Sequence, residues 1–126
     1  SSSIAKVAYA VVSGEVAAAE GDLPKAIEQL REAVVLEDQL IYSEPAAWYI
    51  PTRQTLGAIL LKANDYGEAE TVYEEDLEHL RQNGWSLMGL YQSLKAQDKQ
   101  EEAQAIKKEF DKAWQYADIT IDATVL

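Results

Sequence analysis

His79 is the single histidine of the chain and the first residue to consider for acid–base or metal chemistry. It follows the run Glu74-Glu75-Asp76-Leu77-Glu78, and side chains three or four residues apart share one face of a helix. Glu75, Glu78 and His79 therefore offer the donor types of a metal site. General acid–base catalysis also needs a partner group and a cleft, and nothing else in the sequence specifies either. An acidic helix face in water is far more common, so we expect no catalytic residue, metal or cofactor.

Other catalytic motifs are absent from the sequence. It contains no Gly-rich phosphate loop, nucleophile elbow, Ser-x-x-Lys or His-Glu-x-x-His. The 126 residues include no cysteine, which excludes disulfides, thiolate metal ligands and a cysteine nucleophile. The sequence therefore predicts a protein that is not an enzyme.

Charge and hydropathy restrict the partners. With 11 basic and 22 acidic residues, the net charge of -11 would repel a phosphate backbone, so we expect no nucleic acid and favour a basic partner. No apolar run is long enough to span a bilayer, so no membrane partner is expected. We expect a cytoplasmic chain, unless a targeting signal precedes Ser1-Ser2-Ser3, a start without an initiator methionine.

Length and composition predict one folded domain, residues 1–126. Three segments of it share a spacing, in which a two-residue motif is followed by an alanine 13 residues after its first residue. The second and third copies are 34 residues apart, whereas the first and second are 43 apart, which indicates an insertion of about nine residues at about 41–49. The copies begin at Ser13-Gly14, Leu56-Gly57 and Leu90-Tyr91 and reach Ala26, Ala69 and Ala103.

Apolar residues recur at helical spacing in and around each copy and predict six amphipathic helices. Gly21-Asp22, Asn64-Asp65 and Asp98 mark tight turns where a left-handed backbone is needed. The expected repeats cover about 7–40, 50–82 and 84–117, and the β-branched tail 118–126 should be extended. The predicted core stripes include Ile27, Leu30, Val34; Leu56, Ile59, Leu60; Ala69, Val72, Tyr73, Leu77, Leu80; Leu87, Leu90, Leu94; and Ala103, Ile106, Phe110, Ala113, Trp114.

Over about residues 7–117 this pattern resembles the tetratricopeptide repeat, and the second copy, with Leu56, Gly57, Ala69 and Tyr73, fits best. The chain is also similar to the C-terminal repeat segment of larger bacterial proteins of this family, through Tyr42 to Pro45, Leu56 to Ala58 and Asn83 to Leu90. The resemblance implies an all-α fold of three antiparallel helix hairpins in a right-handed superhelical solenoid.

In this family the first helix of each hairpin lines a concave groove that holds a peptide. The resemblance thus implies a non-catalytic scaffold that binds a peptide or protein. The alternative is a structural or regulatory C-terminal segment of a larger multidomain protein or enzyme. The carboxylate clamp of the family's chaperone-tail binders is not matched here. Carried over by position, the groove residues are Glu15, Gln54, Ala58, Leu61, Lys62, Trp85, Met88, Gln92 and Lys95.

Five further expectations concern packing. Trp85 and Met88 are either groove anchors or core residues. Arg53, at a partly buried position, should pair with Asp76 or Glu44. Buried Gly57 should let two helices approach. The first helix is apolar on several sides, so an upstream repeat or a second copy in a homodimer should cover it, and the tail should cover Phe110 and Trp114.

Overall fold

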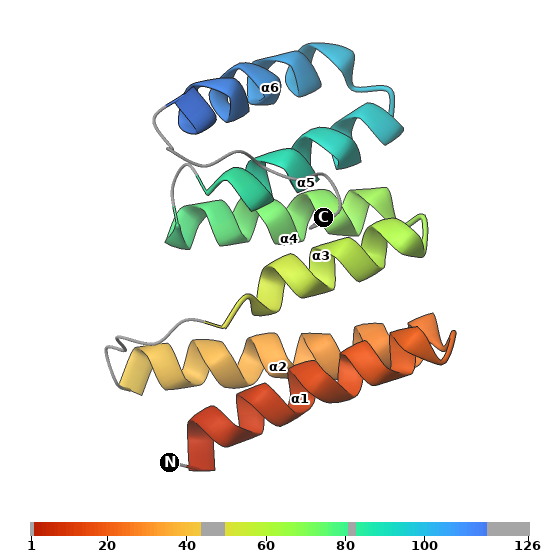
Figure 1. Cartoon of the computed structure of the whole chain (residues 1–126), viewed down its shortest axis with the longest axis vertical. Coiled ribbons are helices and arrows are strands. Elements are labelled where there is room, and N and C mark those ends of the chain that lie inside the picture. The colour runs from red at the N-terminus through yellow and green to blue at the C-terminus, as the bar shows by residue number, and fades with distance from the viewer. Residues whose placement is uncertain (1, 44–49, 81–82, 116–126) are drawn as a thin grey trace. The chain divides into compact units, whose positions relative to one another are not determined.

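The computed structural model describes all residues except 1, 44–49, 81–82 and 116–126. The described residues form six α-helices and no strand, which confirms the predicted all-α class for this part of the chain. The predicted extended tail and most of the predicted insertion lie outside the described residues. The helices are α1 (Ser2–Ala19), α2 (Leu23–Ser43), α3 (Thr52–Lys62), α4 (Tyr66–His79), α5 (Gly84–Ala96) and α6 (Gln100–Gln115), as drawn in Figure 1.

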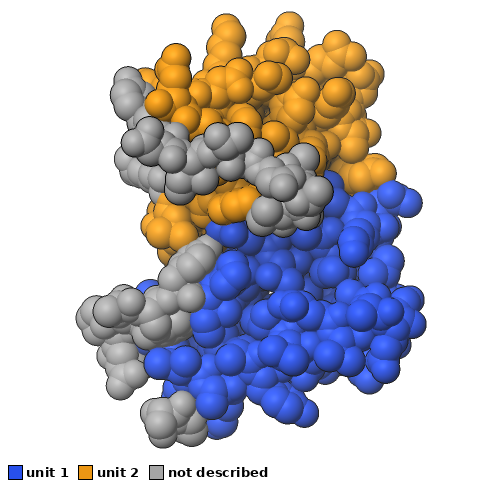
Figure 2. All heavy atoms as spheres, in the orientation of Figure 1, with its two compact units in different colours: residues 1–64 blue, residues 65–126 orange. Residues whose placement is uncertain are grey.

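The chain divides into two compact units, residues 1–64 and 65–126 (Figure 2). In the first unit α1 packs on α2 and α2 on α3, and in the second α4 packs on α5 and α5 on α6. Helices that are neighbours in sequence thus pack together in both units. Two of the expected hairpins, α1–α2 and α5–α6, each lie within one unit.

The tight turns have the backbone that the sequence predicts. Gly21, Asn64 and Asp98 have φ angles of 86°, 60° and 63°, in the left-handed region that Gly, Asn and Asp adopt most readily. After the first turn, Asp22 Oδ1 accepts a hydrogen bond of 3.2 Å from the Lys25 N–H. This bond satisfies one of the free donors at the beginning of α2.

In the first unit, α1 and α2 approach closely at Gly14. A Cβ placed there would lie 2.6 Å from Leu30 Cγ, and Leu30 is fully buried. The absence of a side chain at Gly14 therefore allows the close packing of α1 on α2. The buried stripe of α2 is Ala26, Leu30, Ala33, Glu37 and Leu40.

This stripe of α2 shares Leu30 with the predicted one. Ile27 and Val34 are only half-buried, whereas their small neighbours Ala26 and Ala33 are fully buried in their place. The helix also continues through Ser43, so it includes residues 41–43, which we had placed in the inserted loop.

In the second unit, Gly89 of α5 lies against the ring of Tyr73 of α4, and Gly84 lies against Trp114 of α6. Tyr73 is buried, as predicted. The last helix is covered less completely. Ala103 is buried, whereas Phe110 and Trp114 are half-buried and meet edge to face with ring centroids 5.7 Å apart. Leu80, which we predicted in the core, is 39% exposed because it follows the end of α4.

Candidate functional site

Helix α3 has one buried face and one accessible face. Its buried residues include Leu56, Gly57, Ile59 and Leu60. None of the predicted groove residues of this helix is among its buried residues: three are half-buried and Lys62 is exposed. Glu15 of α1, the remaining groove residue of the first unit, is also exposed. The groove residues of α3 are Gln54, Ala58, Leu61 and Lys62.

Helix α5 is divided in the same way. Its buried face includes Leu87, Leu90 and Leu94. The predicted groove residues Trp85, Met88, Gln92 and Lys95 recur at intervals of three and four, so they share a face. Trp85 and Met88 are half-buried, and Gln92 and Lys95 are exposed.

Trp85 combines the two roles that we considered for it. Its ring meets the ring of Trp114 at 89°, with centroids 6.3 Å apart, so it is packed on α6. Part of the ring stays accessible. The backbone N–H of Trp85 donates a hydrogen bond of 3.0 Å to Asn83 Oδ1, which caps the beginning of α5. This bond fixes the backbone position from which the Trp85 side chain extends.

The nine predicted groove residues are thus accessible or half-buried, five on α1 and α3 of the first unit and four on α5 of the second. A single groove formed by all nine stays a prediction.

Carboxylates are distributed unevenly among the helices. Helices α3 and α5 contain no Asp or Glu, and α1 contains only Glu15. In contrast, α2 and α6 each contain four Asp or Glu residues, and α4 contains six. The helices predicted to line the groove therefore carry almost none of the negative charge of the chain. We did not anticipate this distribution, although it can be read from the sequence once the helix order is known.

Polar contacts between α2 and α3 hold the groove-bearing helix in the first unit. Arg53 donates two hydrogen bonds, of 2.9 and 2.7 Å, to the two carboxylate oxygens of Asp38. Thr52 Oγ1 donates 3.0 Å to Glu37 Oε2. We call Glu37, Asp38, Thr52 and Arg53 the α2–α3 clasp. Paired hydrogen bonds of this kind fix orientation as well as distance.

The clasp changes our expectation for Arg53. The residue is buried and paired, as predicted, but Asp38 was not among the expected partners. Of those, Glu44 lies outside the described residues and Asp76 belongs to the other unit. The missed signal is the acidic pair Glu37-Asp38, which lies 15 residues before Thr52-Arg53.

In the second unit, a network of hydrogen bonds holds α5, the other groove-bearing helix, against α4. Asp76 of α4 accepts hydrogen bonds from Ser86 Oγ at 2.5 Å and from Asn83 Nδ2 at 3.4 Å. Burial, and then the charge of Asp76, raise the pKa of the Tyr73 phenol. The phenol is therefore neutral at physiological pH, and the Tyr73 ring packs as an uncharged group against Gly89.

Gln97 joins the end of α5 to α4. Its Nε2 donates 2.8 Å to Glu70 Oε1, which also accepts 3.0 Å from Lys99 Nζ. Burial alone would raise the pKa of Glu70, but the bonds from Lys99 and Gln97 hold it below its usual value. Burial and the charge of Glu70 raise the pKa of neighbouring Glu74. We did not predict this cluster, because its contacts join residues that are 27 and 29 positions apart in the chain.

His79 is exposed at the end of α4. Across the described ranges, no group of three His, Cys, Asp or Glu side chains is placed to hold a metal ion. None of the six described helices combines the length and apolar character that a bilayer-spanning segment requires.

Comparison of the chain with protein-family models gives no match, and comparison with curated proteins gives no significant match.

Proposed function

We propose that the chain is a non-catalytic scaffold of three helix hairpins in a right-handed solenoid, and that it binds a peptide or protein segment along the accessible faces of α1, α3 and α5. The uneven distribution of carboxylates supports this proposal most directly. Three helices keep a face that is not used in the core, and those helices contain one acidic residue between them, Glu15.

The composition of these faces indicates the chemistry of the ligand. Leu61, Trp85 and Met88 are partly accessible apolar groups, of the kinds that bury well against a partner's apolar side chains. Gln54 and Gln92 can donate and accept hydrogen bonds with a peptide backbone. A segment with apolar anchor residues would therefore fit these faces best.

Charge outside the faces favours basic residues flanking the anchors. The net charge of -11 attracts cations over a distance of about 8 Å at physiological salt. Because this attraction is screened, association should slow as salt is raised, while the apolar contacts persist.

A peptide selection tests the proposal. Peptides selected from a random display library on the 126-residue chain are titrated against the chain and against Met88→Glu and Leu61→Glu variants. Each variant places a carboxylate on a proposed contact face, and we expect affinity to fall about tenfold or more. Val35→Glu is the matched control, because Val35 is an exposed apolar residue of α2 that is not on these faces.

Equal binding by Met88→Glu and Val35→Glu would contradict the placement of the ligand. Failure to select any peptide that binds the wild-type chain would contradict the function itself.

A further inference from the structure

Helix α1 leaves large apolar side chains in water. Tyr9, Val12 and Val16 are 75%, 58% and 51% exposed, although Val7 and Ala17 of the same helix are buried against the rest of the unit. A contiguous apolar patch of this kind marks an interaction surface more often than an isolated exposed residue does.

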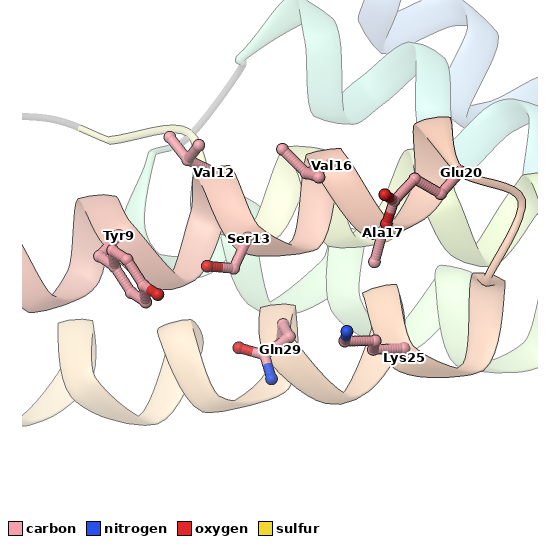
Figure 3. Close-up of a pocket in the computed structure, with 8 residues that line it drawn as sticks. All are labelled: Tyr9, Val12, Ser13, Val16, Ala17, Glu20, Lys25 and Gln29. Carbon is pink, nitrogen blue, oxygen red and sulfur yellow. The ribbon is translucent and has the colours of Figure 1, made fainter.

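The surface beside these residues is hollowed. Between α1 and α2 lies an open pocket of about 520 Å³. In Figure 3, Tyr9 and Ser13 point from α1 towards α2, whereas Val12 and Val16 lie along the other edge of α1. The exposed apolar side chains therefore line a hollow on one face of the unit. A two-fold interface needs one patch that complements itself, and an apolar hollow beside α1 can serve as such a patch.

The residues on this face follow a heptad spacing. Lys6, Tyr9, Ser13, Val16 and Glu20 are separated by three, four, three and four residues, the repeat that lets two helices pack along their length. The backbone N–H of Glu20 donates 3.0 Å to Val16 O, so helical geometry extends to Glu20. We call these five residues and Val12 the α1 stripe. On an ideal helix they fall within an arc of about 120°.

The charges of the α1 stripe lie at its two ends. Lys6 precedes Ser13 by seven residues and Glu20 follows it by seven, so the small residue Ser13 is the midpoint. An antiparallel second α1 related by a two-fold axis through Ser13 would place each Lys6 beside Glu20 of the second copy. The same axis would place each Tyr9 beside Val16 of the second copy.

The opposite charges at the two ends of the α1 stripe indicate which partner would fit it. Lys6 and Glu20 are both exposed, and within the described residues neither takes part in an ion pair. A uniformly basic or acidic helix would complement one end of the stripe and oppose the other. A second copy of the chain complements both ends.

We propose that the α1 stripe is the interface of a homodimer in which the two α1 helices pack antiparallel about Ser13. Glu15 is outside the α1 stripe: on an ideal helix it projects about 160° away from Ser13 and about 60° away from Val12, at the edge of the stripe. The proposed dimer does not depend on peptide binding.

Charge reversal tests the register of the dimer. Sedimentation equilibrium at about 0.15 M salt, where net repulsion is largely screened, should give twice the 14.0 kDa of the chain. Lys6→Glu and Glu20→Lys should each raise the dimer dissociation constant about tenfold, since each replaces two attractive contacts by two repulsive ones. The double variant should return it to within about threefold of wild type. Glu15→Lys, a charge reversal on α1 outside the stripe, is the matched control.

Crosslinking tests the position of the axis. The chain has no cysteine, so Ser13→Cys introduces one thiol per copy, at the point where the two copies would meet. Mild oxidation should give a covalent dimer at protein concentrations where Lys108→Cys, an exposed thiol on α6, stays monomeric.

The apolar part of the α1 stripe has its own test. Val12→Asp and Val16→Asp should abolish the dimer, and circular dichroism should show that helix content is kept, because both residues are largely exposed.

Several outcomes would overturn the proposal. If the wild-type chain stays monomeric up to about 1 mM, the homodimer is refuted, and the α1 stripe is the contact surface for a different helix, such as one of an upstream repeat. A dimer that persists in both Val→Asp variants, or that the double charge reversal fails to restore, would place the interface elsewhere or in another register.

Discussion

The close approach of α5 to α4 allows a stability measurement with an internal control. A Cβ added at Gly89 would lie 2.5 Å from Tyr73 Cε2, about 1 Å nearer than carbon atoms pack without repulsion. The Tyr73 ring is rigid and 4% exposed, so it has little room to move. Overpacking of this kind costs about 1–3 kcal/mol, and the gain of up to about 1 kcal/mol from replacing a helical glycine only partly offsets it. Gly89→Ala should therefore lower the free energy of unfolding.

Gly67 of α4 provides the control. A Cβ placed there would meet no atom nearer than Gln97 Oε1, at 3.9 Å. Gly67→Ala should thus keep the helix-propensity gain without any clash and raise stability by up to about 1 kcal/mol. The two variants carry the same substitution in neighbouring helices, so the propensity gain cancels in the comparison. We expect them to differ by the overpacking cost alone, about 1–3 kcal/mol.

Urea unfolding followed by far-ultraviolet circular dichroism measures both variants. A fall in the midpoint without a change in slope would show a change in stability alone. Adding Tyr73→Leu to Gly89→Ala should recover part of the loss, because the ring that clashes has been removed. If the Gly89→Ala and Gly67→Ala variants unfold at the same urea concentration, the packing of α5 on α4 has been described wrongly.

Three further predictions concern the polar contacts and Gly57. In the clasp, Asp38→Asn should lower the free energy of unfolding by about 2 kcal/mol, because it weakens the acceptor of a buried guanidinium. Arg53→Met should lower it by only about 1 kcal/mol, because Asp38 is 43% exposed and can be hydrated again. Equal urea midpoints for the two variants would refute this order. The pKa of Glu70 is depressed below 4.5, so its contacts stabilise the fold above that pH and lose effect as pH falls through the depressed value. Glu70→Gln should therefore flatten the decline of melting temperature below about pH 4.5, and an unchanged decline would show that Lys99 contributes nothing there. Gly57 is buried in α3, so Gly57→Leu should cost about 1–3 kcal/mol or more through overpacking, and a thermal melt with the wild-type midpoint would count against its placement.

Local features of the fold were predictable from sequence because their causes are local. Asn64 and Asp98 tolerate a left-handed backbone better than other non-glycine residues, so their positions between apolar stripes identified the turns. The spacing of Leu56, Ile59 and Leu60 likewise identified the buried face of α3, because helical periodicity alone determines which residues share a face.

Features that depend on contacts between helices were not predictable in the same way. Charge alone made several acidic residues equally good partners for Arg53, and only the packing of α3 on α2 selects Asp38. The end of α2 was misplaced because residues 41–43 include apolar and aromatic side chains that suit a helix and an ordered loop equally well. The groove residues of α3 and α5 were carried over from the family resemblance, whereas the contact of Trp85 with Trp114 needed the structure.

Within each unit, the packing of helices that are neighbours in sequence also has a kinetic consequence. Contacts such as those of Gly14 with Leu30 and of Tyr73 with Gly89 join residues that are only 16 apart. Closing such short loops costs little entropy, so chains dominated by them fold within microseconds to milliseconds. The two units can therefore fold independently of each other. During synthesis, the hairpin of α1 and α2 can fold before the rest of the chain has left the ribosome.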